Sequence, residues 1–227
     1  MLALKDIKIY FSMLFHYKPK KFWNELLSNS FDLRGVGHYR LSNEENLKMY
    51  EHKKKILLDE MNHNLIHINS STKIVEIGCG VGYWTDMFKS LGATDYTGND
   101  IAEISVTNLQ NKFPEYKFLH GDISEVMLDK NKFNLGVMID VTQHITDDSR
   151  FNEAMENLWQ SLKNNSHLII TMWDPKKNVY LSNKLRLNRI EKPRGLKLYL
   201  DIFGDKAEVI TNTDFNDKFL LIIKKHE

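Results

Sequence analysis

The sequence is poor in cysteine and proline and has no long apolar run. Of its 227 residues, only Cys79 is a cysteine and four are prolines. One cysteine cannot form a disulfide within the chain, so the fold does not depend on an oxidising compartment. No apolar run approaches the roughly 18 residues that a membrane-spanning helix needs. The sequence therefore predicts a cytoplasmic globular protein of one domain of ordinary size.

Neither sign of charge is in excess, since 31 basic and 30 acidic residues leave a formal net charge of +1. This balance offers no bulk attraction for nucleic acid, and we expect none as a partner. Residues 1–22 mix apolar side chains with lysines and lack a signal-peptide cleavage site. Two interpretations stay open for them: a helix in peripheral contact with a membrane surface, or a helix packed on the domain.

Short strands alternate with helices from Lys73 onward, which predicts parallel strand pairs and an α/β sandwich. A helix is expected at residues 147–163, where apolar side chains recur at helical spacing. A second helix is expected at Asn43–Met61, because Ser42 and Glu45 form a capping box at its start. Two last strands, joined by NTDFND, predict an antiparallel hairpin. The expected strands are Lys73–Ile77, Asp95–Gly98, Tyr116–Leu119, Asn134–Asp140, His167–Met172, Ala207–Thr211 and Lys218–Lys224.

Three alternate glycines, Gly78, Gly80 and Gly82, follow the first of these strands. A strand, a glycine loop and a helix together indicate a nucleotide-like ligand held against bare backbone. The spacing is neither G-x-G-x-x-G nor the phosphate loop. Glu76 stands two residues ahead of the loop, where a carboxylate suits an ammonium or sulfonium better than a pyrophosphate.

Acids also follow the next two expected strands. Asp100 could accept hydrogen bonds from two ribose hydroxyls, as acids at this position do. Asp122 could accept a hydrogen bond from the exocyclic amine of an adenine, and Ile123 could pack against the adenine ring. Together with Glu76, these acids indicate an adenosine ligand with a positive end that is not a phosphate.

The runs VEIGCGVG, YTGNDIAE, FLHGDIS and FNLGVMIDVTQHI resemble, in this order, the motifs of the class I S-adenosylmethionine-dependent methyltransferases. The resemblance covers about Lys73–Met172 and the closing hairpin. It implies an α/β, Rossmann-like, doubly wound seven-stranded sheet that is mostly parallel, with an antiparallel C-terminal hairpin strand. It also implies S-adenosylmethionine as cofactor and S-adenosylhomocysteine as product. The residues it assigns to the cofactor are Glu76, Gly78, Cys79, Gly80, Gly82, Asp100, Ile101, Asp122, Ile123 and Asp140.

The segment before the first strand has a narrower likeness. FWNELLSNSFDLRGVGHYR resembles a group of bacterial and archaeal methyltransferases linked with glycan and cell-surface polysaccharide synthesis. The likeness implies a helical lid at residues 1–70 over a methyltransferase domain at residues 71–227, within a single domain overall; the alternative is an ordinary surface loop. The residues expected to face the substrate are Arg34, Gly37, His38, Tyr39, Arg40 and Trp84.

Catalysis is expected at the end of the fourth strand, where Asp140 and His144 lie. The ordinary pKa of histidine, about 6.5, suits a general base, although His144 could equally be a packing residue. Asp140-Val141-Thr142-Gln143 lacks the proline and aromatic residues of nucleic-acid amino-methylating enzymes, and no cluster has metal-ligand spacing. The sequence therefore predicts metal-independent O-methylation of a small molecule or glycan. The alternatives are N-methylation of an amino sugar or other amine, a catalytically silent binding module, and a nicotinamide oxidoreductase.

Overall fold

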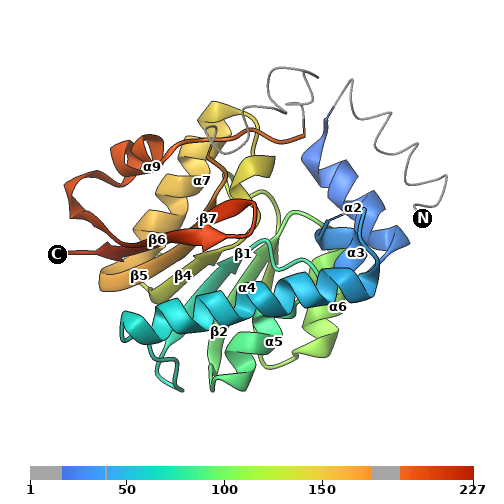
Figure 1. Cartoon of the computed structure of the whole chain (residues 1–227), viewed down its shortest axis with the longest axis horizontal. Helices are drawn as coiled ribbons and strands as arrows, with labels where there is room; N and C mark the ends of the chain where they lie inside the picture. The colour runs from blue at the N-terminus through green and yellow to red at the C-terminus, as the bar shows by residue number, and fades with distance from the viewer. Residues whose placement is uncertain (1–16, 39, 175–189) are drawn as a thin grey trace.

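A seven-stranded sheet forms the centre of the computed structural model, which describes residues 17–38, 40–174 and 190–227 (Figure 1). The strand order is β3-β2-β1-β4-β5-β7-β6. Neighbouring strands run parallel except β7, which is antiparallel to both β5 and β6. The expected fold class is thus confirmed. The strands are β1 (Lys73–Ile77), β2 (Asp95–Asp100), β3 (Lys117–His120), β4 (Phe133–Met138), β5 (Leu162–Met172), β6 (Ala207–Phe215) and β7 (Lys218–Lys225).

The closing hairpin is tighter than the sequence predicted. The expected six-residue connection is wrong, because β6 continues to the fully buried Phe215 and only Asn216 and Asp217 form the turn. Asn216 has a φ of 66°, and two-residue hairpin turns favour asparagine at such positions. Strand β5 also begins five residues earlier than expected, directly after helix α7.

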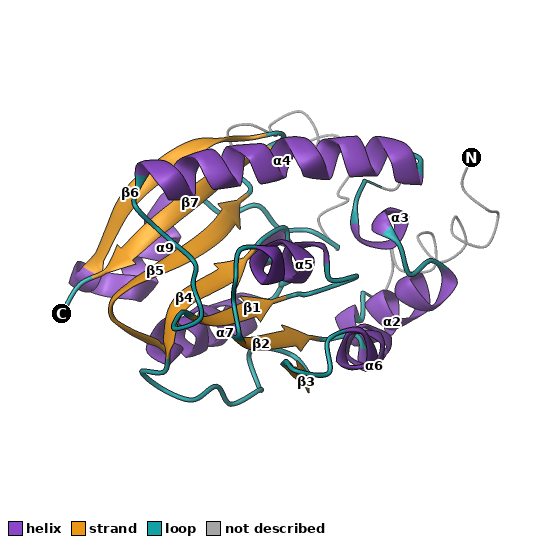
Figure 2. Ribbon diagram, turned by 90° about the horizontal axis from the view of Figure 1, so that it is seen from below, coloured by secondary structure: helices purple, strands orange, loops and turns teal. Residues whose placement is uncertain are grey.

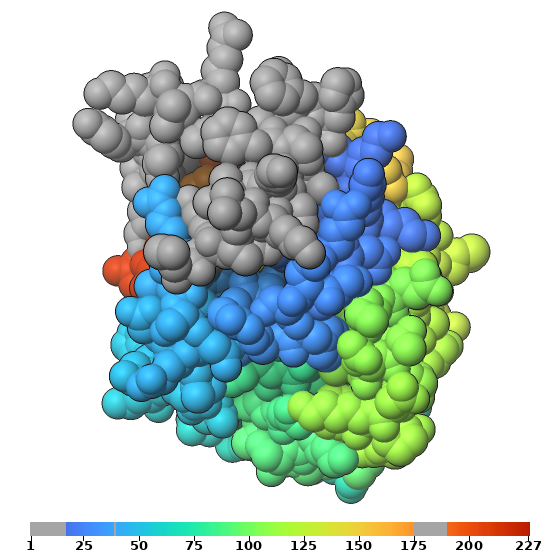
Figure 3. Space-filling model, turned by 90° about the vertical axis from the view of Figure 1, so that its right-hand side faces the viewer, coloured from blue at the N-terminus to red at the C-terminus, as the bar shows by residue number. Residues whose placement is uncertain are grey.

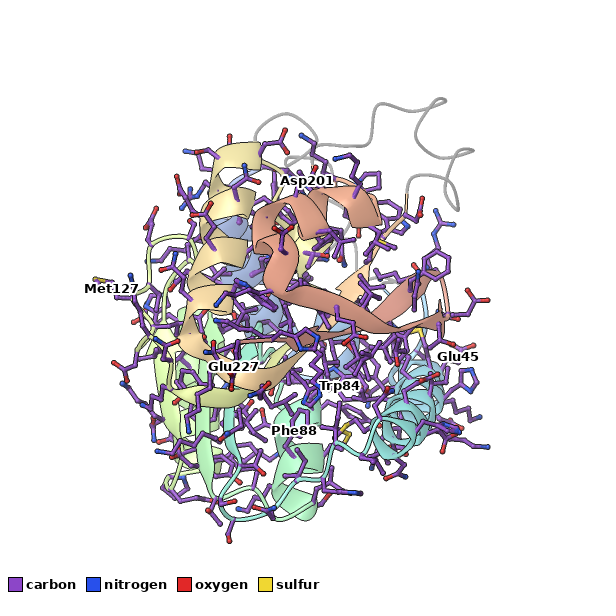
Figure 4. The ribbon with its side chains drawn as sticks, turned by 90° about the vertical axis from the view of Figure 1, so that its left-hand side faces the viewer. Glu45, Trp84, Phe88, Met127, Asp201 and Glu227 are labelled. Carbon is purple, nitrogen blue, oxygen red and sulfur yellow. The ribbon has the colours of Figure 1, made fainter. Side chains whose placement is uncertain are left out.

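Helices cover both faces of the sheet (Figure 2). On one face, α4 (Asn43–His63), α5 (Tyr83–Ser90) and α6 (Glu103–Lys112) share a core with β1. On the other, α7 (Asp148–Ser161) and α9 (Leu196–Phe203) pack on β4, β5 and β7. Trp84 and Phe88 of α5 lie inside the molecule, whereas Met127 and Asp201 lie at its surface (Figure 4).

The predicted capping box of α4 is confirmed, since Ser42 Oγ accepts from the Glu45 amide and Glu45 accepts from the Ser42 amide. Residues Leu57 and Met61 of α4 lie in the same apolar core as β1. Helix α4 is therefore packed directly on the sheet. Among the described residues, no helix is both long and apolar enough to cross a membrane.

Two further helices, α2 (Pro19–Asn29) and α3 (Leu33–Val36), precede α4. Asp32 is the N-cap of α3, and its side chain accepts a hydrogen bond from the Arg34 amide. Helix α2 lies beside α6, and α3 lies beside α4 (Figure 3). Most of the segment for which membrane contact was considered, residues 1–16, lies outside the described residues.

Candidate active site

A cavity of about 360 Å³ opens at the carboxyl ends of β1, β2 and β4. The glycine loop and the residues after β2, β3 and β4 form its floor and sides, while Trp23, Leu27 and Val36 reach it from α2 and α3. Residues far apart in the sequence therefore enclose one space. Parallel strands place their carboxyl ends at one edge of a sheet, which is where ligands bind in this class of fold.

The three glycines of the loop all have positive φ, but the absence of a Cβ makes room for a different neighbour at each of them. A Cβ on Gly78 would lie 2.2 Å from Val141, and one on Gly80 would lie 2.8 Å from Val36. Gly82 is the N-cap of α5, and a Cβ there would lie 2.5 Å from Leu109 of α6. The absence of a side chain at Gly82 therefore allows α6 to pack close to the start of α5. The strand-and-loop pattern of the sequence did not predict this contact.

Glu76 is buried beside the loop and does not line the cavity. Its Oε2 accepts hydrogen bonds from the hydroxyls of Tyr96 and Thr85, whereas its Oε1 has no hydrogen-bond partner within the described structure. Burial raises its pKa to about 7, against the opposing effect of the two hydroxyls. Glu76 is thus a buried acid close to half-protonated at neutral pH.

Asp100 ends β2, as predicted, and lines the cavity. Its carboxylate accepts hydrogen bonds from the Gly80 and Ala102 amides, each at 2.8 Å. Burial nevertheless raises its pKa, because the two amides offset desolvation only in part. These bonds fix the carboxylate next to the glycine loop.

Asp122 follows β3 and lines the cavity with Ile123. Oδ1 accepts from the amide and hydroxyl of Ser124, and Oδ2 lies 3.0 Å from Arg150. Arg150 is the only lysine or arginine among the described lining residues, and it also pairs with Glu125. A pyrophosphate would therefore meet carboxylates here rather than an unpaired cation.

Asp140 lies two residues beyond β4 rather than at its end, with a φ of 61°. Its Oδ2 lies 2.7 Å from Nζ of Lys53 and its Oδ1 lies 3.0 Å from Nζ of Lys218. Burial alone would raise its pKa, but the two lysines hold it well below the ordinary value. Such a carboxylate stays ionised and accepts a proton poorly, so its predicted catalytic role cannot be that of a general base.

His144 ends the 3-10 turn η1 (Thr142–His144) and lines the same cavity. Its Nδ1 lies 3.3 Å from the Ile190 carbonyl, so we assign the proton to Nδ1. Its Nε2 lies 3.1 Å from the amide nitrogen of Gln143, and the Trp23 ring meets the imidazole edge-on at 4.9 Å. Burial lowers its pKa, so the imidazole is neutral at physiological pH.

Most of the predicted cofactor residues share this cavity. Those that line it are Gly78, Cys79, Gly80, Asp100, Ile101, Asp122, Ile123 and Asp140, whereas Glu76 and Gly82 do not line it. His144, predicted as catalytic, and Trp84, predicted to face the substrate, also line the cavity. The predicted lid residues Arg34, Gly37, His38 and Arg40 are not among the lining residues, and Tyr39 lies outside the described residues. Arg34 instead pairs with Asp32 at 2.6 Å, and Gly37 packs against Asn46.

Several lining or supporting residues were not predicted. Val36, Trp23 and Tyr50 line the cavity, and Lys53 and Lys218 stand behind its wall. Lys53 had a usable signal, because it falls on the buried stripe of α4 with Tyr50, Leu57 and Met61, where a lysine is unusual. Lys218 is the first residue of β7, and its sequence position gave no sign of a role at the cavity.

The residues present suit an adenosine with a cationic tail. Ile101 and Ile123 offer apolar surface, Asp100 and Asp122 offer acceptors, and the glycine loop offers bare backbone. A phosphate would face Asp100 and Asp140 instead. In the part of the chain that the structure describes, no group of three or more His, Cys, Asp or Glu side chains could hold a metal ion.

Comparisons with known proteins agree with this geometry. Residues 74–165 match the family model described as "Methyltransferase domain". A probable S-adenosylmethionine-dependent methyltransferase of Mycolicibacterium smegmatis is 28% identical over 87 residues, which are 38% of this chain and 34% of that protein. The chain thus matches about a third of the length of this curated relative.

Solved structures share the fold. The magnesium protoporphyrin IX methyltransferase of Synechocystis PCC 6803, with bound S-adenosylmethionine, has a TM-score of 0.64 at 15% identity, over 92% of this chain and 98% of that one. The N-methyltransferase NodS of Bradyrhizobium japonicum WM9, in complex with S-adenosylhomocysteine, has a TM-score of 0.60 at 14% identity, over 78% and 87%. Residues 74–165 are therefore similar to methyltransferase domains, and the chain shares the fold of S-adenosylmethionine-dependent methyltransferases.

Proposed function

We propose that the protein transfers a methyl group from S-adenosylmethionine to a hydroxyl of a small molecule or glycan. The observation that carries the proposal is the presence of a neutral histidine, His144, in the same cavity as Asp100, Asp122 and the glycine loop. When bound, S-adenosylmethionine supplies a methyl group on a positively charged sulfur, which keeps the electron pair of the broken carbon–sulfur bond. A hydroxyl acceptor must also lose a proton.

His144 would receive that proton at Nε2, because Nδ1 is held by the Ile190 carbonyl. The Gln143 amide occupies Nε2 at 3.1 Å, so the acceptor hydroxyl has to replace this hydrogen bond. The Trp23 ring lies edge-on to the imidazole, with the ring centroids 4.9 Å apart. A positioned base of this kind contributes a factor of about 10² to 10⁴ in rate.

An oxygen acceptor is favoured over an amine by the state of Asp140. Asp140 is already paired with Lys53 and Lys218, so its carboxylate is not available to hold a protonated amine next to His144. NodS is an N-methyltransferase, so the fold alone does not choose between the two reactions. Trp23, Leu27 and Val36 cover the cavity, which supports a small acceptor or the end of a glycan rather than a nucleic acid.

The test is transfer of a labelled methyl group to nucleotide sugars, oligosaccharides and phenols, each assayed beside its amino counterpart. We expect oxygen to be methylated in the hydroxyl members. His144→Gln should lower kcat at least about 100-fold and leave the affinity for S-adenosylhomocysteine within about threefold. His52→Gln, an exposed change on α4, is the matched control. Methylation of the amines alone, or full activity of His144→Gln, would contradict the proposal.

A further inference from the structure

A short segment of the chain returns over the turn that carries His144. This segment, residues 190–194, lies between β5 and α9, and we call it the strap. The Lys192 amide donates to the Gln143 carbonyl at 2.7 Å, and the Ile190 carbonyl lies 3.3 Å from Nδ1 of His144. The main chain of the strap therefore contacts η1 at two positions, with one residue between them.

Side chains also hold the strap in place. The Arg194 guanidinium, whose side chain is only 3% exposed, lies 2.9 Å from the carboxylate of Asp148 in α7. Nζ of Lys192 lies 2.6 Å from the same carboxylate. Both basic residues of the strap are thus paired with α7. The remaining charged residue of the strap, Glu191, faces His144.

The carboxylate of Glu191 lies at the edge of the imidazole. Its Oε1 is 3.9 Å from Nε2 of His144, and its side chain is 44% exposed. With the proton of His144 on Nδ1, Nε2 and the carboxylate are both acceptors, so a direct hydrogen bond between them requires a proton on Nε2. Glu191 is not among the described residues that line the cavity, so it acts on an acceptor there through His144.

Charged groups from three parts of the fold act on His144. Burial is the main cause that lowers its pKa, and Glu191, which raises the pKa, has the largest effect of the charged groups. Lys218 of β7 lowers the pKa, and Asp140 after β4 raises it. Before α2, the hydroxyl of Tyr17 donates to the His144 carbonyl at 3.4 Å. Glu191 is therefore the charged neighbour that most favours the protonated ring.

We propose that Glu191 is a positioning residue that acts through His144: its carboxylate stabilises the imidazolium that forms when Nε2 takes the proton of the acceptor hydroxyl. The inference rests on the proposed function and names the partner of its base. The hydroxyl proton passes to Nε2 as the oxygen–methyl bond forms and the methyl–sulfur bond breaks. Nε2 then becomes a donor that faces a carboxylate already held by the strap, so little reorganisation is needed as the charge develops.

The pKa of His144 reports this pair directly, and its measurement requires no acceptor. NMR titration of the full chain gives the pKa, and the imidazole signal of His144 is assigned by its loss in His144→Gln. Glu191→Gln should lower the pKa by at least about 0.5, because it removes a negative charge 3.9 Å from the ring nitrogen.

Three further variants separate charge from general damage. Glu191→Lys reverses the charge and should lower the pKa of His144 further than Glu191→Gln does. Glu191→Asp keeps the carboxylate and should lower the pKa by less than half as much. Glu156→Gln, an exposed change on α7, is the matched control and should leave the pKa at its wild-type value.

Methyl transfer to a hydroxyl acceptor gives the second measurement. Glu191→Gln should lower kcat about tenfold and leave the KM for the acceptor within about twofold, because Glu191 acts on the imidazolium and does not bind the acceptor. The acid limb of the kcat profile should move to lower pH together with the pKa of His144.

A His144 pKa that stays within about 0.2 of wild type in Glu191→Gln would overturn the inference and leave the proposed function standing. A raised KM with unchanged kcat would also overturn it, because Glu191 would then bind the acceptor itself. A lowered pKa in a protein that methylates only amines would overturn the proposed function, and with it the role of Glu191 in proton transfer.

Discussion

Val36 lies over Gly80 so closely that a Cβ on Gly80 would be 2.8 Å from Val36 Cγ1. This contact joins α3 to the glycine loop, so the segment before the first strand forms part of the wall of the cavity. This part of the wall is apolar, whereas the residues that the sequence predicted there, such as Arg34 and His38, are polar.

Gly80→Ala should weaken binding of S-adenosylhomocysteine at least about tenfold. The substitution strains a backbone with a φ of 53° and pushes Val36 or the loop away. Calorimetry measures the effect, and circular dichroism checks the fold. Gly195→Ala is the control, because its Cβ would meet nothing within 4 Å. Wild-type affinity in Gly80→Ala would show that the contact between Val36 and the glycine loop has no part in binding the ligand.

Gly82→Ala should affect stability first. Its Cβ would lie 2.5 Å from Leu109 and 3.3 Å from Phe113, at a φ of 81°. Overpacking and backbone strain together should lower the free energy of unfolding by about 2 kcal/mol or more. Urea denaturation measures this. An unchanged midpoint would mean that α6 can move away without loss, contrary to the packing described.

Asp100→Asn should lower the affinity for S-adenosylhomocysteine at least about tenfold, because the bonds to Gly80 and Ala102 weaken and, under the expected ribose role of Asp100, a charged acceptor for two hydroxyls is lost. Asp95→Asn, at the exposed start of the same strand, is the matched control. Equal affinities of the two variants would argue against the ribose role of Asp100.

Glu76 gives the stability a pH dependence of known sign. Its folded pKa of about 7 lies above the ordinary glutamate value, so between about pH 4.5 and pH 7 the folded state binds more protons than the unfolded state. Its contribution to stability is therefore present at low pH and is lost as the pH rises through 7.

Glu76→Gln removes this titration and should be more stable relative to wild type at pH 8 than at pH 5, by up to about 3 kcal/mol. Urea denaturation of both proteins at the two pH values measures the difference. Parallel pH dependence of the two proteins would mean that Glu76 is ionised in the folded state throughout this range.

Local patterns predicted much of the fold and part of the site. The apolar run of β1, the capping box of α4 and the acid at the end of β2 depend on neighbours in sequence, and all three were predicted. The meeting of Lys53, Asp140 and Lys218 depends on where α4 and β7 cross the end of β4, which no local pattern encodes. The orientation of Glu76 is another such case, because its partners Tyr96 and Thr85 belong to other elements.

Calorimetric titration of the wild-type protein with S-adenosylmethionine, S-adenosylhomocysteine and NAD⁺ tests the central claim most directly. The cavity is lined by carboxylates, isoleucines and a glycine loop, and it has no unpaired lysine or arginine among its described lining residues. The account therefore predicts micromolar binding of both sulfur nucleotides and no binding of NAD⁺. Binding of NAD⁺, or of neither sulfur nucleotide, would contradict it.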